Sequence, residues 1–95
     1  MDINFNNKIK FPSEVIVQQI SDGELIMLNT STENYFGLDE TGTIFFNSLI
    51  NSQNINEALE NIYNTYEVER DTLTGDLQSF INDLKKNNLI EIESF

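Results

Sequence analysis

Residues 24–38, ELIMLNTSTENYFGL, decide the fold together with residues 39–42, DETG, which follow them directly. Apolar and aromatic side chains fill both ends of the first stretch, and a polar turn at residues 30–33 separates them. This pattern predicts two antiparallel strands, the second of which runs straight into a helix. Because residues 25–28 are all apolar, the first of these strands is expected to be central, covered on both sides or partly by helices.

A further strand is predicted upstream, at about residues 14–20, where Val15, Ile16 and Val17 are β-branched. The turn signal Ser21-Asp22-Gly23 would join it to the next strand, since Gly accepts positive φ. Three strands joined by short turns make an antiparallel meander. Residues 1–13, which are rich in Asn and Lys, are interpreted as an N-terminal arm, extended or loosely held, before a single domain at residues 14–95.

Three helices are expected after the strands. Asp39 is a candidate N-cap for a helix that ends near Ile50 and buries Ile44, Phe45 and Leu49, with Phe46 as a further candidate. Gly42 costs helix stability, which suggests that another backbone approaches closely there. Asn54 and Glu57 resemble a capping box for a second helix.

The last part of the chain predicts a third helix, from about Asp71 to Asn87. Its apolar stripe consists of Leu73, Leu77, Phe80 and Leu84, with Ile81 on one flank. Asn87 and Asn88 can supply the left-handed residue that ends the helix. Residues 89–92 are expected to return as a short strand or to pack on the sheet. The predicted fold class is therefore α+β, a three-stranded antiparallel meander followed by three α-helices, which allows a winged helix-turn-helix-like core.

The composition restricts the chemistry available to this chain. It has no Cys and no His, which excludes disulfides, thiolate or imidazole metal sites and Ser-His-Asp triads. Five Lys and Arg against sixteen Asp and Glu give a formal net charge of −11. Such a surface should repel nucleic acid and anionic membranes and attract a basic peptide or protein face. The simpler alternative is that the acidity only keeps a small domain soluble.

Other sequence features are also negative. No apolar run is long enough to cross a bilayer, and no signal peptide pattern starts the chain, so a cytoplasmic location is expected. The acidic run at residues 57–71 does not have the spacing of the twelve-residue calcium loop. No catalytic constellation accompanies the predicted fold. We therefore expect a protein that is not an enzyme and holds no cofactor or metal.

Three segments resemble the PqqD-like proteins. ELIMLN (residues 24–29) followed by YFGLDETG (residues 35–42) is similar to a strand and a following Leu-Asp-x-Thr-Gly segment in that family, and DLQSFINDL (residues 76–84) with Leu89-Ile90 is similar to its last helix and tail. The resemblance covers about residues 14–92. Phe45 or Phe46 stands where many members have Trp, and Asn88 stands where Gly is common.

The resemblance implies a recognition element for ribosomally synthesised, post-translationally modified peptides (a RiPP recognition element). Such a domain binds the leader of a precursor peptide as an extra strand against its third strand, with the leader's side chains facing the third helix. It does no catalysis itself and delivers the precursor to a separate modifying enzyme. Lasso-peptide pathways use such a stand-alone subunit beside a leader protease. The expected partners are thus a precursor peptide and a modifying enzyme, and the chain itself is expected to be a monomer or a weak dimer.

The residues expected to bind the peptide lie on the third strand and the third helix. They are Asn34, Tyr35, Phe36, Gly37, Leu38, Asp76, Leu77, Phe80, Ile81, Leu84 and Lys85. Some of these residues have a simpler interpretation without a ligand: the apolar ones could be core residues, and Asp76 and Lys85 could belong to the solvated helix surface. A leader anchor is expected beside Tyr35 and Ile81, so that Tyr35→Ala or Ile81→Asp would weaken binding while the fold persists.

Strand alternation refines this expectation. Asn34, Phe36 and Leu38 should point to one face of the sheet, and Tyr35 and Gly37 to the other. Two alternative functions stay open. A winged-helix transcriptional regulator would need a basic recognition helix, whereas the third helix has basic residues only at its end. A dimerisation module would pair its exposed sheet edge with that of a second copy.

Overall fold

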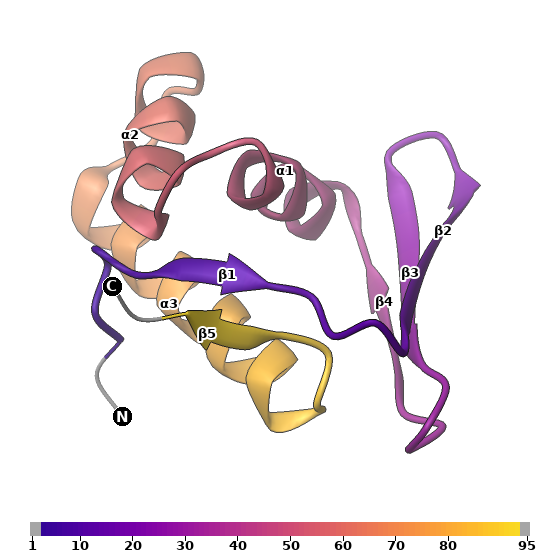
Figure 1. Cartoon of the computed structure of the whole chain (residues 1–95). Coiled ribbons are helices and arrows are strands. Elements are labelled where there is room, and N and C mark those ends of the chain that lie inside the picture. Colours follow the sequence, from indigo (N-terminus) through magenta and orange to yellow (C-terminus); the bar gives the residue numbers. More distant parts are fainter. Residues whose placement is uncertain (1–2, 94–95) are drawn as a thin grey trace.

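The computed structural model describes residues 3–93, so that residues 1–2 of the arm and 94–95 of the predicted domain lie outside it (Figure 1). In chain order its elements are β1 (Lys8–Lys10), β2 (Val15–Ser21), β3 (Glu24–Asn29), β4 (Tyr35–Leu38), α1 (Glu40–Ile50), α2 (Ile55–Thr65), α3 (Arg70–Lys86) and β5 (Glu91–Glu93). The predicted α+β class and the meander followed by three helices are confirmed.

The three-stranded sheet has the order β2-β3-β4, and both pairs are antiparallel. Gly23 has φ of 75°, which suits the predicted turn between β2 and β3. The pairs Met27–Phe36 and Leu25–Leu38 fix the register of β3 against β4. β3 is central, as expected from its apolar composition.

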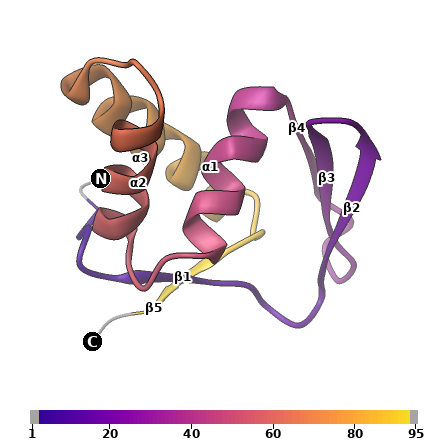
Figure 2. The same cartoon turned by 90° about the horizontal axis from the view of Figure 1, so that it is seen from above.

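Of the two kinds of cover expected for β3, burial on both sides and partial cover by helices, the structure shows the second. Helix α1 lies against one face, which we call the inner face, and Met27 there is fully buried (Figure 2). No described element packs on the other face, the outer face, where Ile16 and Tyr35 are 52% and 69% exposed. The apolar side chains on the outer face of β3 are therefore only half-buried, because strand composition alone does not say what packs above it.

The start of α1 is fixed by the predicted cap. The Asp39 carboxylate accepts a hydrogen bond from the Gly42 N–H at 2.8 Å, which satisfies one of the free donors of the first turn. A Cβ at Gly42 would lie 3.4 Å from Phe80 Cε1 and 3.4 Å from Leu38 Cβ. The close neighbours of Gly42 are thus side chains of α3 and β4 rather than the backbone expected there. The absence of a side chain at Gly42 lets α1, α3 and β4 pack closely at this point.

The second and third helices also follow local signals. Asn54 caps α2 by accepting the Glu57 N–H at 2.8 Å, but the Glu57 carboxylate accepts from Gln53 N–H rather than closing a capping box on Asn54. At the C-terminal end of α3, Asn88 has φ of 61° and is the left-handed residue that ends the helix, as predicted. The core is formed mainly where the helices meet one another and the inner face.

The two ends of the described chain pair with each other. β1 and β5 form a separate two-stranded antiparallel sheet in which Ile9 faces Ile92. Ile9 is buried in the core, and the arm also accepts hydrogen bonds from the start of α2, where Ile55 N–H donates to Asn7 O at 2.9 Å. Of the two states expected for the arm, the structure shows the extended one. Of the two outcomes expected for residues 89–92, a short strand or packing on the sheet, it shows the short strand, at Glu91–Glu93.

Candidate functional site

The edge of β4 that faces away from β3 is open. Within residues 3–93, β4 pairs only with β3, because the arm and the tail are engaged with each other in the β1–β5 sheet. An open edge presents main-chain N–H and C=O groups that another strand can pair with. Neither end of the described chain therefore fills the place where an added strand would lie.

The register identifies which residues offer their main chain at this edge. The Asn29 N–H donates to Asn34 O at 2.8 Å, so these two residues form a hydrogen-bonded pair across the β3–β4 turn. In an antiparallel ladder hydrogen-bonded and non-hydrogen-bonded pairs alternate. The main chains of Phe36 and Leu38 thus point towards β3, and those of Tyr35 and Gly37 point outwards. An added strand would pair with Tyr35 and Gly37.

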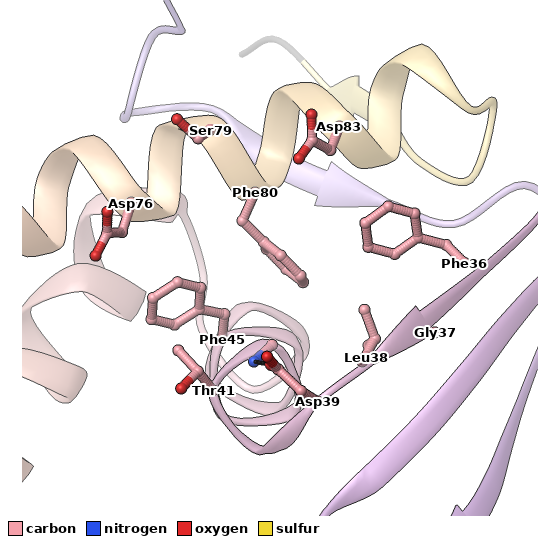
Figure 3. A pocket seen from close by; sticks show the side chains of 11 residues that line it. Phe36, Gly37, Leu38, Asp39, Thr41, Phe45, Asp76, Ser79, Phe80 and Asp83 are labelled. Atoms are coloured by element: carbon pink, nitrogen blue, oxygen red, sulfur yellow. Dashed lines mark hydrogen bonds between the residues drawn. The ribbon is translucent and has the colours of Figure 1, made fainter.

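A groove runs between this open edge and α3 (Figure 3). Its volume is about 400 Å³. We call it the β4–α3 groove, and it is lined by residues of β4, of the first turns of α1 and of one face of α3. They are Phe36, Gly37, Leu38, Asp39, Thr41, Gly42, Phe45, Asp76, Ser79, Phe80 and Asp83.

Aromatic side chains form the apolar part of the groove. Phe80 points from α3 towards α1, and its ring meets that of Phe45 edge to face, with the centroids 5.5 Å apart (Figure 3). Phe36 and Leu38 reach the groove from β4. A side chain of a bound strand that enters between them would lose its contact with water, which favours apolar anchors.

The polar part of the groove is acidic. Asp76 and Asp83 stand on α3, two turns apart on one face of the helix, and Asp39 caps α1 at the opposite wall. No Lys or Arg is among the lining residues. In a chain with a net charge of −11, this arrangement favours a ligand with basic side chains.

The structure places the predicted site residues in three groups. Phe36, Gly37, Leu38, Asp76 and Phe80 line the β4–α3 groove. Leu77, Ile81 and Leu84 are buried in the core, so the groove wall on α3 is formed by Phe80 and not by Ile81. The remaining three, Asn34, Tyr35 and Lys85, are exposed and do not line the groove.

Two of these exposed residues have defined surroundings. The Asn34 side-chain amide donates to Asn87 O at 3.4 Å, which links the β3–β4 turn to the end of α3. The Tyr35 side chain lies on the outer face beside Leu28, its partner in β3. The predicted alternation along β4 holds, and it turns the Tyr35 side chain away from the groove while its main chain faces the open edge. The anchor position expected beside Tyr35 and Ile81 is therefore not formed.

Residues 24–90 match the sequence pattern of the family described as coenzyme PQQ synthesis protein D (PqqD). The chain belongs to the PqqD family. Among solved structures, the complex of TbiB1 with the TbiA(beta) leader peptide is similar at 32% identity, over 86% of this chain and 94% of that chain, with a TM-score of 0.78. A lasso peptide synthetase B1 complexed with the leader peptide, 21% identical, shares the fold over 88% of this chain and 98% of that chain, with a TM-score of 0.77. A search among curated proteins gave no match.

In this PqqD-family protein, sequence reasoning missed part of the groove lining. Ser79 and Asp83 share a helix face with Asp76 and Phe80, and the spacing of three or four residues could have identified them. Asp39, Gly42 and Phe45 were interpreted only as a helix cap, a close-approach glycine and a buried helix residue, and Thr41 was named only within the segment that resembles the family. Their position at the groove follows from the packing of α1 between β4 and α3.

The described residues of this PqqD-family protein form neither a membrane-spanning helix nor a cluster of metal ligands. No helix within residues 3–93 combines the length and the apolar composition needed to cross a membrane. Across the same residues, no group of three or more acidic side chains is placed so that it could hold a metal ion.

Proposed function

We propose that this protein binds the leader of a ribosomally synthesised precursor peptide by strand addition and delivers it to a separate modifying enzyme, without catalysing a reaction itself. The observation that carries the proposal is the open edge of β4 beside the β4–α3 groove. Main-chain pairing supplies part of the affinity, and the groove selects the side chains. The likeness to two B1 proteins in complex with leader peptides supports the same role.

The leader would pair with the outward main-chain groups of Tyr35 and Gly37. Every second leader side chain would then point into the groove, towards Phe80 and Phe45, and the others would lie on the outer face of the sheet. An apolar residue is the expected groove anchor, with basic residues near Asp76 and Asp83. The main chain of β4 would thus fix the register of the leader, and the side chains of the groove would select its sequence.

Delivery needs a second surface, and the outer face of the sheet provides one. It is hollowed over about 400 Å³ between Ile16, Ile26, Leu28 and Tyr35, and no charged residue lines this hollow. Ile16 and Tyr35, at the two sides of this hollow, are 52% and 69% exposed. Exposed apolar patches of this kind mark protein interaction sites. Because an added leader strand would extend the same face, we assign it to the modifying enzyme, which would contact protein and leader together.

The main-chain pairing can be tested at Gly37. The Gly37→Pro variant loses an N–H that points away from β3, so the β3–β4 ladder keeps its hydrogen bonds and the edge strand tolerates the change. Gly37→Ala is the matched control, since a Cβ at this position meets no atom within 4 Å. The probe is a peptide enriched from a displayed library of random sequences on the wild-type protein.

We expect Gly37→Pro to weaken binding of the selected peptide about tenfold, because a lost hydrogen bond that leaves its partner unpaired costs roughly 1–3 kcal/mol. Gly37→Ala should bind almost as the wild type does, in calorimetric titration. Binding should also protect the amides of Tyr35 and Gly37 from hydrogen exchange. The proposal fails if no peptide is enriched, or if both variants bind equally while these amides stay unprotected.

A further inference from the structure

A second apolar pocket adjoins the β4–α3 groove and has no role in the pairing described above. It lies where α1, α2, α3 and the loop between α2 and α3 meet, and its volume is about 190 Å³. Ile44, Ile62 and Leu73 form its apolar lining, and Tyr66 and Val68 bring the loop to it.

The two pockets are adjacent. Thr41, Phe45 and Asp76 line both of them, so a peptide that passes the end of β4 at Leu38 and the first turn of α1 would come next to the second pocket. Phe45 separates the two volumes, with the ring of Phe80 on its other side. The second pocket therefore adjoins the groove beyond the end of the open edge.

The lining of the second pocket is incompletely covered by the protein itself. Tyr66 and Val68 are 44% and 42% exposed, although both side chains are large and apolar in their main part. Leu73 and Ile62, by contrast, are buried beneath them. An apolar side chain that entered here would cover Tyr66 and Val68 and gain the free energy of burial on both sides of the contact.

Size limits what can enter. An apolar cavity of about 150 Å³ holds a benzene molecule, so a pocket of about 190 Å³ admits one aromatic ring or one branched aliphatic side chain. It does not admit a second strand or a helix. The occupant is therefore a single large apolar residue, and the lining shared with the groove assigns it to the same peptide.

We infer that the pocket between Ile44, Ile62, Val68 and Leu73 is a second anchor site for the bound leader, which takes one large apolar side chain located beyond the segment that pairs with β4. This inference rests on the proposed leader-binding function. It predicts leaders with two separated apolar anchors, one at Phe80 and one in this pocket, rather than one continuous apolar segment.

The test uses the peptide selected on the wild-type protein as probe. Val68→Asp places a charge at the mouth of the second pocket, and Val17→Asp is the matched control, because Val17 is 38% exposed and lies on β2, which β3 separates from the open edge. A second variant, Thr72→Phe, fills the pocket with a ring from the protein itself. Thermal melting confirms that all three variants fold.

We expect Val68→Asp and Thr72→Phe each to weaken peptide binding about tenfold, which corresponds to the loss of one buried apolar side chain. Val17→Asp should bind like the wild type. An alanine scan of the peptide should find one apolar residue whose replacement weakens binding to the wild-type protein but not to the Val68→Asp variant. In NMR titrations, the methyl signals of Ile62 and Leu73 should shift with the amide signals of Tyr35 and Gly37.

Two outcomes separate this inference from the proposed function. If the Tyr35 and Gly37 amides respond but the Ile62 and Leu73 methyl signals do not, and Val68→Asp binds like Val17→Asp, the second anchor site is wrong and leader binding stands. If neither set of signals responds to the selected peptide, the leader-binding proposal fails and the second anchor site fails with it.

Discussion

The side-chain amide of Asn29 donates a hydrogen bond to the main-chain carbonyl oxygen of Asn88 at 2.6 Å. Asn29 ends β3, and Asn88 is the left-handed residue that follows α3. The amide oxygen of the same side chain, Asn29 Oδ1, accepts hydrogen bonds from the N–H groups of Ser31 and Thr32. One buried side chain thus shapes the β3–β4 turn and ties it to the end of α3, which fixes the spacing of the two groove walls.

Replacement of this side chain should be costly. Asn29→Ala leaves the Asn88 carbonyl and two N–H groups without their partner at a site that is 4% exposed, and we expect a loss of about 2–3 kcal/mol in the free energy of unfolding. Urea denaturation measures this loss. The control is Asn34→Ala, which removes an exposed hydrogen bond of 3.4 Å and should cost under about 0.5 kcal/mol. Equal losses in the two variants would contradict the role given to Asn29.

Neighbouring residues of α3 should respond in opposite ways. Ile81→Asp buries a carboxylate at a site with no exposed surface, which costs several kcal/mol and should abolish folding. Phe80→Ala removes a half-buried groove residue, so that the fold should persist while affinity for the selected peptide falls about tenfold. Circular dichroism and titration measure the two effects. A folded Ile81→Asp protein with weakened binding would restore the site expected from the sequence.

The ion pair between Glu60 and Arg70 gives a pH-dependent prediction. The hydrogen bond from Arg70, whose guanidinium also lies 4.3 Å from the centroid of the Tyr63 ring, lowers the pKa of Glu60 below its ordinary value of 4.5. Since the folded-state pKa is the lower one, the stabilisation is present above pH 4.5 and is lost as the pH falls through the lowered pKa. The melting temperatures of wild type and Glu60→Gln should differ slightly at neutral pH and converge in acid. A difference that grew on acidification would contradict this sign.

Charge in the groove should act on peptide choice. We expect peptides enriched on the wild-type protein to carry more Lys and Arg than the input library, and Asp83→Asn to weaken their binding about twofold to fivefold. Asp22→Asn, at the tip of the β2–β3 turn, changes the net charge equally but lies outside the groove lining. Peptide titrations of both variants at low and at high salt distinguish the two effects. At low salt, Asp83→Asn should lose more affinity than Asp22→Asn, because charges interact over a longer range there.

The parts of the fold that were predictable are those with local causes. The cap at Asp39, the turn at Gly23 and the left-handed Asn88 are each fixed by the chemistry of one or two residues. The β1–β5 pairing has no such signal, since three-residue strands contain too little pattern to assign a partner. Which flank of α3 faces the groove depends on the position of β4, so sequence periodicity could not choose between Phe80 and Ile81.

The pairing of β1 with β5 also bears on the order in which the molecule forms. It joins segments from opposite ends of the chain, and contacts between such distant segments are slow to form because a long loop must close first. Two of the three elements that line the groove, β4 and α1, by contrast follow each other directly in sequence. During refolding, the surface offered to a peptide should therefore begin to form before the ends of the chain meet. Pairing of β1 with β5 would then be the last step and would stabilise an open edge of β4 that has already formed.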